Sequence, residues 1–179
     1  MTWNRGPQEA VPSMNEGDRM VELIPRLRRY ARALVGDRSS ADDLVQDTLE
    51  RAWTKLHLYR RGTDLRAWLF TVMHNVHVNK VRAMRPTDSL DEDTPEIALR
   101  ASQGDSLVMR DLDRSIALLP TEQRAVLLLV TLEDMSYDEV ARTLEIPIGT
   151  VMSRLSRARE KLRAMMQGQS PAAKLKVVK

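Results

Sequence analysis

The chain of 179 residues contains no cysteine, which excludes disulfide bonds and thiolate metal sites. Aromatic residues make up only 4% and glycines number seven, and this composition favours helices over strands. No apolar run is long enough to span a membrane, and the N-terminal residues lack the apolar centre of a secretory signal. We therefore expect an all-α protein that is not inserted in a membrane and is cytoplasmic.

Charge is distributed unevenly along the chain, although the net charge is only +3. Residues 86–113 hold eight acidic side chains against two arginines, whereas residues 147–179 hold eight basic side chains against a single glutamate. This uneven charge predicts that different parts of the chain carry different binding surfaces. The basic C-terminal part is where a polyanion would bind.

Turn-forming and polar stretches divide the chain into two small helical domains. We expect a flexible arm over residues 1–17, a first helical domain over 18–86 and a second over 107–167. Residues 87–106, which are acidic and contain proline and glycine, are predicted to be a flexible linker, and residues 168–179 a flexible tail.

In the first domain, Gly36 is placed to end one helix, and Ser39 or Ser40 to cap the next. Helical periodicity gathers the apolar residues of this second helix on one side and polar, mostly acidic residues on the other. The acidic face is a plain solvated surface or a protein-binding site, and it consists of Asp43, Gln46, Asp47 and Glu50.

The segment LRAWLFTVMHNVHVNKVRAMR has a broad apolar stripe, and its opposite strip is almost free of acids. Neutral hydrogen-bonding groups mixed with cations suit nucleobases and phosphates. The strip consists of Thr71, Asn75, Asn79 and Arg82, and the preceding turn adds Arg60 and Arg61. His74 and His77 have no third ligand at metal spacing, so we interpret them as ordinary helix residues and predict no metal site.

The second domain has the features of a helix-turn-helix. Thr121 is expected to cap a strongly apolar helix, and Ser136 with Glu139 matches a capping box. A short turn that contains Gly149 follows, and Thr150 is expected to cap the last helix.

In this last helix, Val151, Leu155 and Ala158 begin an apolar stripe that anchors it. Basic side chains near a helix C-terminus complement its dipole, but arginines in the first turns do not. Outward-facing residues of these turns would therefore enter a DNA major groove. They are Met152, Ser153, Arg154, Ser156 and Arg157.

Three stretches, taken together and in this order, resemble the extracytoplasmic-function sigma factors of bacterial RNA polymerase. They are ADDLVQDTLERAW, LRAWLFTVMHNVHVNK and LPTEQRAVLLLVTLEDMSYDEVARTLEIPIGTVMSRLSRAREKL. The resemblance extends from Leu23 to Leu162. It implies two helical domains, sigma domains 2 and 4, joined by a flexible linker.

The resemblance also assigns roles to the residues. The acidic face would bind the polymerase core, and Met152 to Arg157 would read the minus 35 element. The loop from Arg60 to Arg66, with the strip of Thr71, Asn75, Asn79 and Arg82, would melt and read the minus 10 element. The implied partners are the polymerase core, promoter DNA and an anti-sigma factor; the free chain would be a monomer without cofactor or enzymatic activity.

Another hypothesis is a dimeric helix-turn-helix regulator that uses its first domain for dimerisation or sensing. It accounts for the C-terminal half alone, and a stable dimer that protects a palindromic operator would favour it. An enzyme is poorly supported, because no catalytic triad, paired carboxylates or metal-ligand spacing is present.

Overall fold

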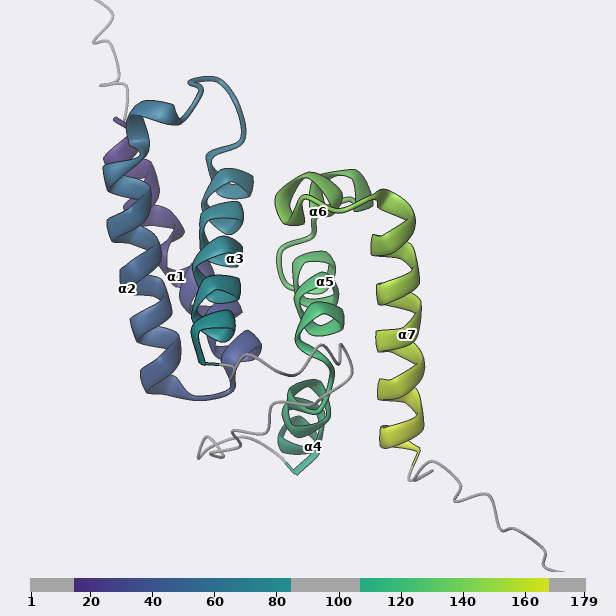
Figure 1. Ribbon diagram of the computed structural model, residues 1–179. Helices are drawn as coiled ribbons and strands as arrows, with labels where there is room; N and C mark the ends of the chain where they lie inside the picture. Colours follow the sequence, from purple (N-terminus) through teal and green to yellow (C-terminus); the bar gives the residue numbers. More distant parts are fainter. Residues whose placement is uncertain (1–14, 85–106, 168–179) are drawn as a thin grey trace, which may run out of the picture.

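The computed structural model describes residues 15–84 and 107–167, and within them the protein is entirely helical (Figure 1). The all-α prediction is thus confirmed for this part of the chain. None of its helices is long and apolar enough to cross a bilayer. The expected linker, the tail and the arm before Asn15 lie outside the described residues. The elements are α1 (Glu16–Val35), α2 (Arg38–Thr54), the 3-10 helix η1 (Leu56–Leu58), α3 (Leu65–Met84), α4 (Leu107–Ala117), α5 (Thr121–Thr131), α6 (Tyr137–Leu144) and α7 (Ile148–Met166).

Side-chain caps begin both α1 and α2, and a left-handed glycine ends α1. Asn15 Oδ1 accepts a hydrogen bond of 2.9 Å from the amide of Asp18, so α1 begins at Glu16, slightly earlier than expected. At its C-terminus Gly36 adopts the left-handed conformation with φ of 78°, as predicted. The next helix is capped by Asp37, whose side chain accepts from the amide of Ser40 at 2.8 Å. The predicted serine cap was therefore wrong.

In the second unit, the capping box is confirmed. The amide of Ser136 donates to Glu139 Oε2 at 2.7 Å, and the amide of Glu139 donates to Ser136 Oγ at 3.3 Å. The threonine caps are wrong, because Pro120 and Pro147 hold the N-cap positions of α5 and α7 and make no side-chain cap. A proline with φ near −60° already directs the chain into a helix, so no side-chain acceptor is required at that point.

The turn between α6 and α7 also differs from the expected glycine turn. Its left-handed residue is Glu145, with φ of 55°, and the following amide of Ile146 donates to the carbonyl of Ala141 at 3.0 Å. This closes the end of α6 in the manner of a Schellman motif. Gly149 instead lies in the first turn of α7, where an added Cβ would meet nothing within 4 Å.

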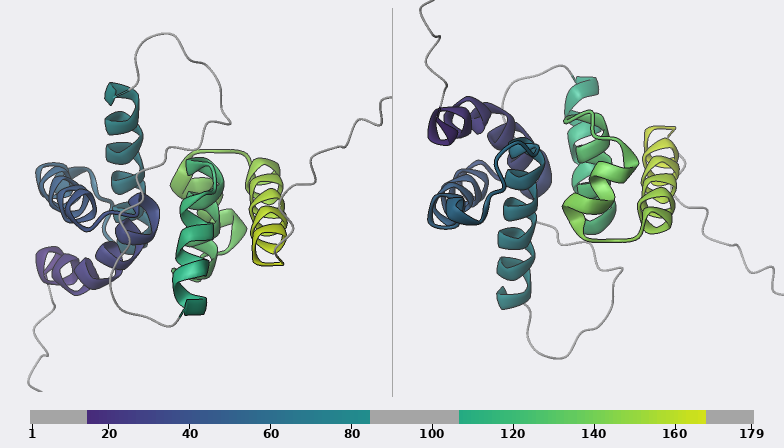
Figure 2. Two further views of the ribbon diagram at one scale, coloured as in Figure 1. Left: turned by 90° about the horizontal axis from the view of Figure 1, so that it is seen from below. Right: turned by 90° about the horizontal axis from the view of Figure 1, so that it is seen from above.

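The helices form two units that touch each other. Helices α1, α2 and α3 pack together, with Tyr30 and Phe70 in an edge-to-face contact at 5.1 Å between ring centroids. Helices α5, α6 and α7 form the other unit, and α4 contacts α7. Across the boundary α3 lies against α6, and α1 lies against α4 and α5, as the views in Figure 2 show.

Loss of the capping box should weaken the second unit. Replacing Ser136 with alanine leaves the amide of Glu139 without its acceptor, so we expect the free energy of unfolding to fall by about 1 kcal/mol. Chemical denaturation followed by circular dichroism measures the change. The exposed Ser39, replaced in the same way, should have little effect. Equal losses in both variants would contradict the capping role.

Candidate nucleic-acid and protein interfaces

Helix α7 is anchored by one buried side and open on the other. Val151, Leu155 and Ala158 are buried, as the sequence predicted. Because side chains three and four positions apart share a face, the residues between them are directed outward. The exposed side chains of its first turns are Met152, Ser153, Ser156 and Arg157. They form a continuous, mainly polar surface on the helix that follows the turn.

Arg154 differs from its neighbours on α7. Its guanidinium forms an ion pair with the carboxylate of Glu122 at the start of α5, and only 22% of its side chain is exposed. Both residues, with Arg157, line a shallow hollow between the first turns of α5 and α7. The structure therefore brings Arg154 to the same surface as Arg157, but Arg154 is paired with Glu122.

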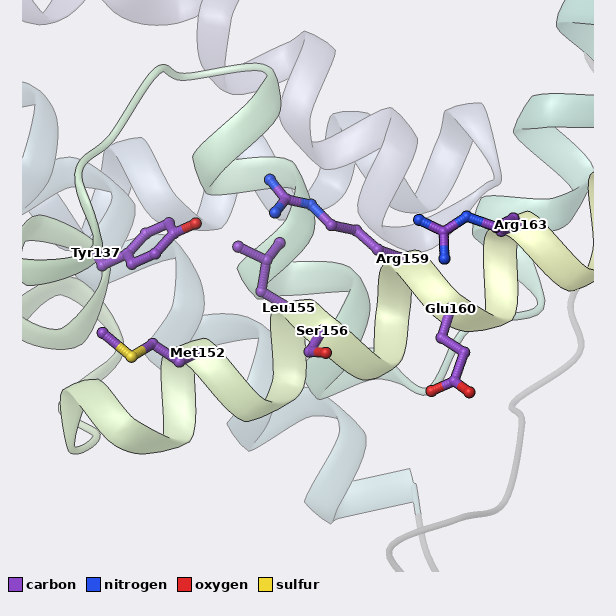
Figure 3. A pocket seen from close by; sticks show the side chains of 7 residues that line it. All are labelled: Tyr137, Met152, Leu155, Ser156, Arg159, Glu160 and Arg163. Carbon is purple, nitrogen blue, oxygen red and sulfur yellow. The ribbon is translucent and has the colours of Figure 1, made fainter.

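A groove runs between α6 and α7 on the same side as Met152 (Figure 3). Tyr137 of α6 forms one wall, and Arg159 and Arg163 project to the same side of α7. Glu160 also lines the groove, but its carboxylate extends in another direction than the two guanidinium groups. The sequence analysis counted the two arginines in the basic C-terminal part of the chain but did not assign them, or Tyr137, to the minus 35 surface. The two arginines lie seven and eleven positions after Met152, so helical periodicity alone places them on its face. The groove extends the basic surface along α7.

On α3, the strip predicted from the sequence is mostly accessible. Asn75, Asn79 and Arg82 are exposed, whereas Thr71 is partly buried and donates its hydroxyl to the carbonyl of Ala67 at 3.1 Å. Residues three, four and seven positions apart lie close on one helical side, so the four groups share a surface.

The turn before α3 presents two further arginines. Arg60 and Arg61 are exposed and precede Gly62, which needs φ of 88°. Arg61 Nε lies 2.9 Å from Glu16 Oε1, an exposed ion pair that contributes little stability. Tyr59 and Trp68 brace the turn, with ring centroids 5.4 Å apart.

Arg66, in contrast, reaches toward the second unit, and its Nη2 also lies 3.5 Å from Oδ2 of Asp64 in the turn. Its Nη1 donates to the backbone carbonyl of Glu133 at 2.6 Å, and its Nη2 lies 3.9 Å from Glu139 Oε1. Only 21% of the side chain is exposed. The structure thus separates Arg66 from the other residues of the predicted strip.

His74 and His77 lie on the side of α3 that faces the second unit. Burial, followed by the charge of Arg154, lowers the pKa of His74 to about 4. Burial lowers the pKa of His77 to about 4 as well, and His74, Arg124 and Lys80 add to the effect. Both imidazoles are therefore neutral at neutral pH. Within residues 15–84 and 107–167, no group of three or more potential ligands could hold a metal ion.

The acidic face on α2 is present as one surface. Asp43, Gln46 and Glu50 are exposed, and Asp47 is partly buried. Asp47 Oδ2 lies 2.5 Å from Nζ of Lys80 on α3, so one carboxylate of the face is already paired. The others remain available to basic groups of another molecule.

The buried histidines make stability depend on pH. Their pKa values of about 4 lie below the ordinary 6.5 that they regain on unfolding, so the unfolded chain binds protons more readily. Stability should be complete above about pH 6.5 and decline as the pH falls toward about 4.

Thermal unfolding followed by circular dichroism at about pH 7.5 and about pH 5 measures this effect. A variant with both His74→Gln and His77→Gln should show a smaller decrease in the unfolding midpoint than the wild type. The exposed His57, changed to Gln, serves as the matched control and should leave the decrease unaltered. An identical decrease in all three proteins would exclude the histidines as its cause.

Comparisons with known proteins identify relatives for both units. A family model described as the Sigma2 domain of PhyR matches residues 15–74, and one described as Sigma-70, region 4 matches residues 109–162. The chain is 33% identical over 151 residues to the ECF RNA polymerase sigma factor EcfG of Rhodopseudomonas palustris (strain TIE-1). This match covers 83% of either protein, and therefore both helical units.

Solved structures give the same result. The sigma factor RpoE from Bartonella quintana, in complex with the anti-sigma factor NepR, has a TM-score of 0.70 and 31% identity; the match covers 83% of this chain and 94% of that chain. CnrH, in complex with the cytosolic domain of CnrY, has a TM-score of 0.66 and 27% identity, with 87% and 89% covered.

Proposed function

Because the chain belongs to the extracytoplasmic-function (ECF) sigma factors of bacterial RNA polymerase, we propose that its separate surfaces divide promoter recognition from core binding. A sigma factor performs no covalent chemistry; it binds the polymerase core and directs it to promoter DNA. In this assignment residues 18–86 are sigma domain 2 and residues 107–167 are sigma domain 4, joined by residues 87–106 as a linker.

The exposed first turns of α7 are assigned to the minus 35 element. The observation that carries the proposal is the anchored helix, which buries Val151 and Leu155 and leaves Arg157 free to extend outward. Arginine reads guanine through two parallel hydrogen bonds in the major groove. The other assigned contacts are Met152, Ser153, Arg154 and Ser156. In the groove of Figure 3, Tyr137, Arg159 and Arg163 are suited to the adjacent phosphates.

The α3 strip and the preceding turn are assigned to the minus 10 element. Amides and a hydroxyl can accept from and donate to bases, while arginines bind the phosphates between them. The assigned residues are Arg60, Arg61, Arg66, Thr71, Asn75, Asn79 and Arg82. Of these, Arg66 must leave its partners in the second unit before it can contact DNA.

The acidic face on α2 is assigned to the polymerase core. It presents Asp43, Gln46 and Glu50 to solvent, and Asp47 at its edge. Opposite charges across an interface guide association and fix its orientation. The first unit would therefore bind the core through α2 and the minus 10 element through α3, whereas the second unit would bind the minus 35 element through α7.

The setting and regulation of the chain follow the same assignment. Transcription takes place in the cytoplasm, and we place this chain there as a monomer when it is free. RpoE and CnrH were solved with NepR and with CnrY, so an anti-sigma partner is proposed for this chain also.

Arg157→Ala should impair minus 35 recognition. If the guanidinium contacts a base through two hydrogen bonds, the loss is about 1–3 kcal/mol in the free energy of binding to the specific site. Transcription with sigma-free core on promoters that differ in the minus 35 element measures it. Removing Arg163, at the far end of the same helix, should weaken binding to all sequences alike. Unchanged promoter preference in the Arg157 variant would show that the reading surface is misassigned.

Reversal of charge on α2 should weaken core association. Glu50→Lys places a cation where the proposal requires a carboxylate, and we expect at least about a tenfold lower affinity, equivalent to about 1.4 kcal/mol. A titration of core polymerase with labelled protein measures the affinity. Asp138→Lys, an equal charge change at an exposed position of α6, is the control and should retain affinity. Equal affinities of the two variants would refute the assignment.

A further inference from the structure

Met152 is an exposed apolar side chain on a surface that is otherwise polar and basic. It lies in the first turns of α7 between serines and Arg157, and 50% of its surface is open to solvent. Met152 shares its groove with Tyr137 of α6 and with the buried Leu155. Two neighbouring helices thus bring three apolar side chains together at one place on the surface that is assigned to DNA.

The groove has an apolar end and a basic end (Figure 3). Met152 and Tyr137 lie at the end where α7 begins, and Arg159 and Arg163 extend from later turns of the helix. Glu160 lines the groove as well, but the two guanidinium groups outnumber its carboxylate. The basic end suits a polyanion, whereas the apolar end gains nothing from a phosphate. A ligand that fits the whole groove therefore combines negative charge with a small apolar group.

Duplex DNA offers this combination in its major groove. The base edges there present hydrogen-bond donors and acceptors, and the apolar substituent among them is the C5 methyl group of thymine. The phosphates lie along the borders of the groove, where basic side chains reach them. Methionine suits a methyl group, because its unbranched chain with three rotatable bonds adapts to the shape of its partner.

The neighbouring side chains do not supply the same discrimination. A serine hydroxyl both donates and accepts, so it can bond to several bases. Ser153 moreover donates its hydroxyl to the carbonyl of Thr150 at 3.1 Å. Arg157 lines the hollow beside α5, on the other flank of the helix, and its guanidinium suits guanine. Among the outward residues of these turns, Met152 is therefore the one whose chemistry selects thymine.

We propose that the apolar end of the groove, lined by Met152, Tyr137 and Leu155, is a subsite for the C5 methyl group of a thymine in the minus 35 element. The inference rests on the assignment of α7 to that element, and it adds the kind of base that one part of the helix reads. Contact removes the methyl group and part of the methionine side chain from water, which favours binding.

Deoxyuridine provides the test, because it lacks only the C5 methyl group of thymine and pairs with adenine in the same way. The preferred minus 35 sequence is first selected from promoters randomised in that element, with the wild-type protein and sigma-free core. Each thymine of the selected element, on either strand, is then replaced singly by deoxyuridine. Competition against the unmodified promoter measures the affinity of the holoenzyme for each duplex.

Met152→Ala removes the proposed contact, and Met166→Ala is the matched control. Met166 is another methionine of α7, with 57% of its surface exposed, and it lies about 21 Å farther along the helix axis. Neither substitution empties a core site, because both side chains are at least half exposed. Both variants should therefore fold, and circular dichroism checks this.

We expect deoxyuridine at one thymine position to lower the affinity of the wild-type holoenzyme about fourfold, the effect of losing one buried methyl group. Met166→Ala should show the same dependence on the methyl group. With Met152→Ala, thymine and deoxyuridine at that position should bind equally well. Met152→Leu, which keeps an apolar side chain at the position, should retain the dependence.

Two results would overturn the proposal. One is a selected element in which no thymine methyl group affects wild-type binding, and the other is a methyl dependence as large in Met152→Ala as in the wild type. Either would direct the apolar end of the groove to a protein partner instead. The assignment of α7 is tested separately: if Arg157→Ala alters promoter preference, that assignment stands even where the methyl test fails.

Discussion

The middle of helix α5 is buried on all sides, and the arrangement of the other helices depends on this. Residues 123–129 are all buried, and α5 contacts α7, α6 and α1. An element that is apolar on most sides must be covered on most sides, or it exposes an extended apolar surface to water. The second unit covers part of it, and α1 of the first unit covers another. Arg124 is the charged residue of this buried stretch, and its guanidinium donates hydrogen bonds to the carbonyls of Leu34 and Leu119, which reduces the cost of burying it.

Charged side chains gather on the exposed sides of the helices, and helices α2 and α7 expose charges of opposite sign. Helix α2 presents carboxylates around Glu50, whereas α7 presents guanidinium groups around Arg157. Each set stands opposite a buried apolar stripe of its own helix, so packing against the core orients the charges outward. The two surfaces thus lie on different helices, as the proposed division between core binding and minus 35 recognition requires.

Much of this could be predicted from local sequence. The helices, the apolar stripe of α7, the glycine at position 36 and the capping box all follow from spacing. Three predicted N-caps were wrong. Asp37, which precedes the serines, caps α2, and prolines instead of threonines hold the N-cap positions of α5 and α7. The fit of α1 to the second unit could not be predicted: Arg29 and Glu133 are 104 positions apart, and no periodicity links them. For the same reason, the engaged states of Arg66 and Arg154 were not foreseen.

In helix α7, the residues that fix its orientation differ from the residues that it exposes to solvent. Glu145 and the buried Val151, Leu155 and Ala158 determine how the helix leaves the turn, while the outward positions bear none of that packing. In the proposed assignment, exchanges at the outward positions would alter which bases are preferred while the helix keeps its place. A duplicated copy of such a chain could acquire a new set of target genes through a few surface substitutions, at little cost to folding.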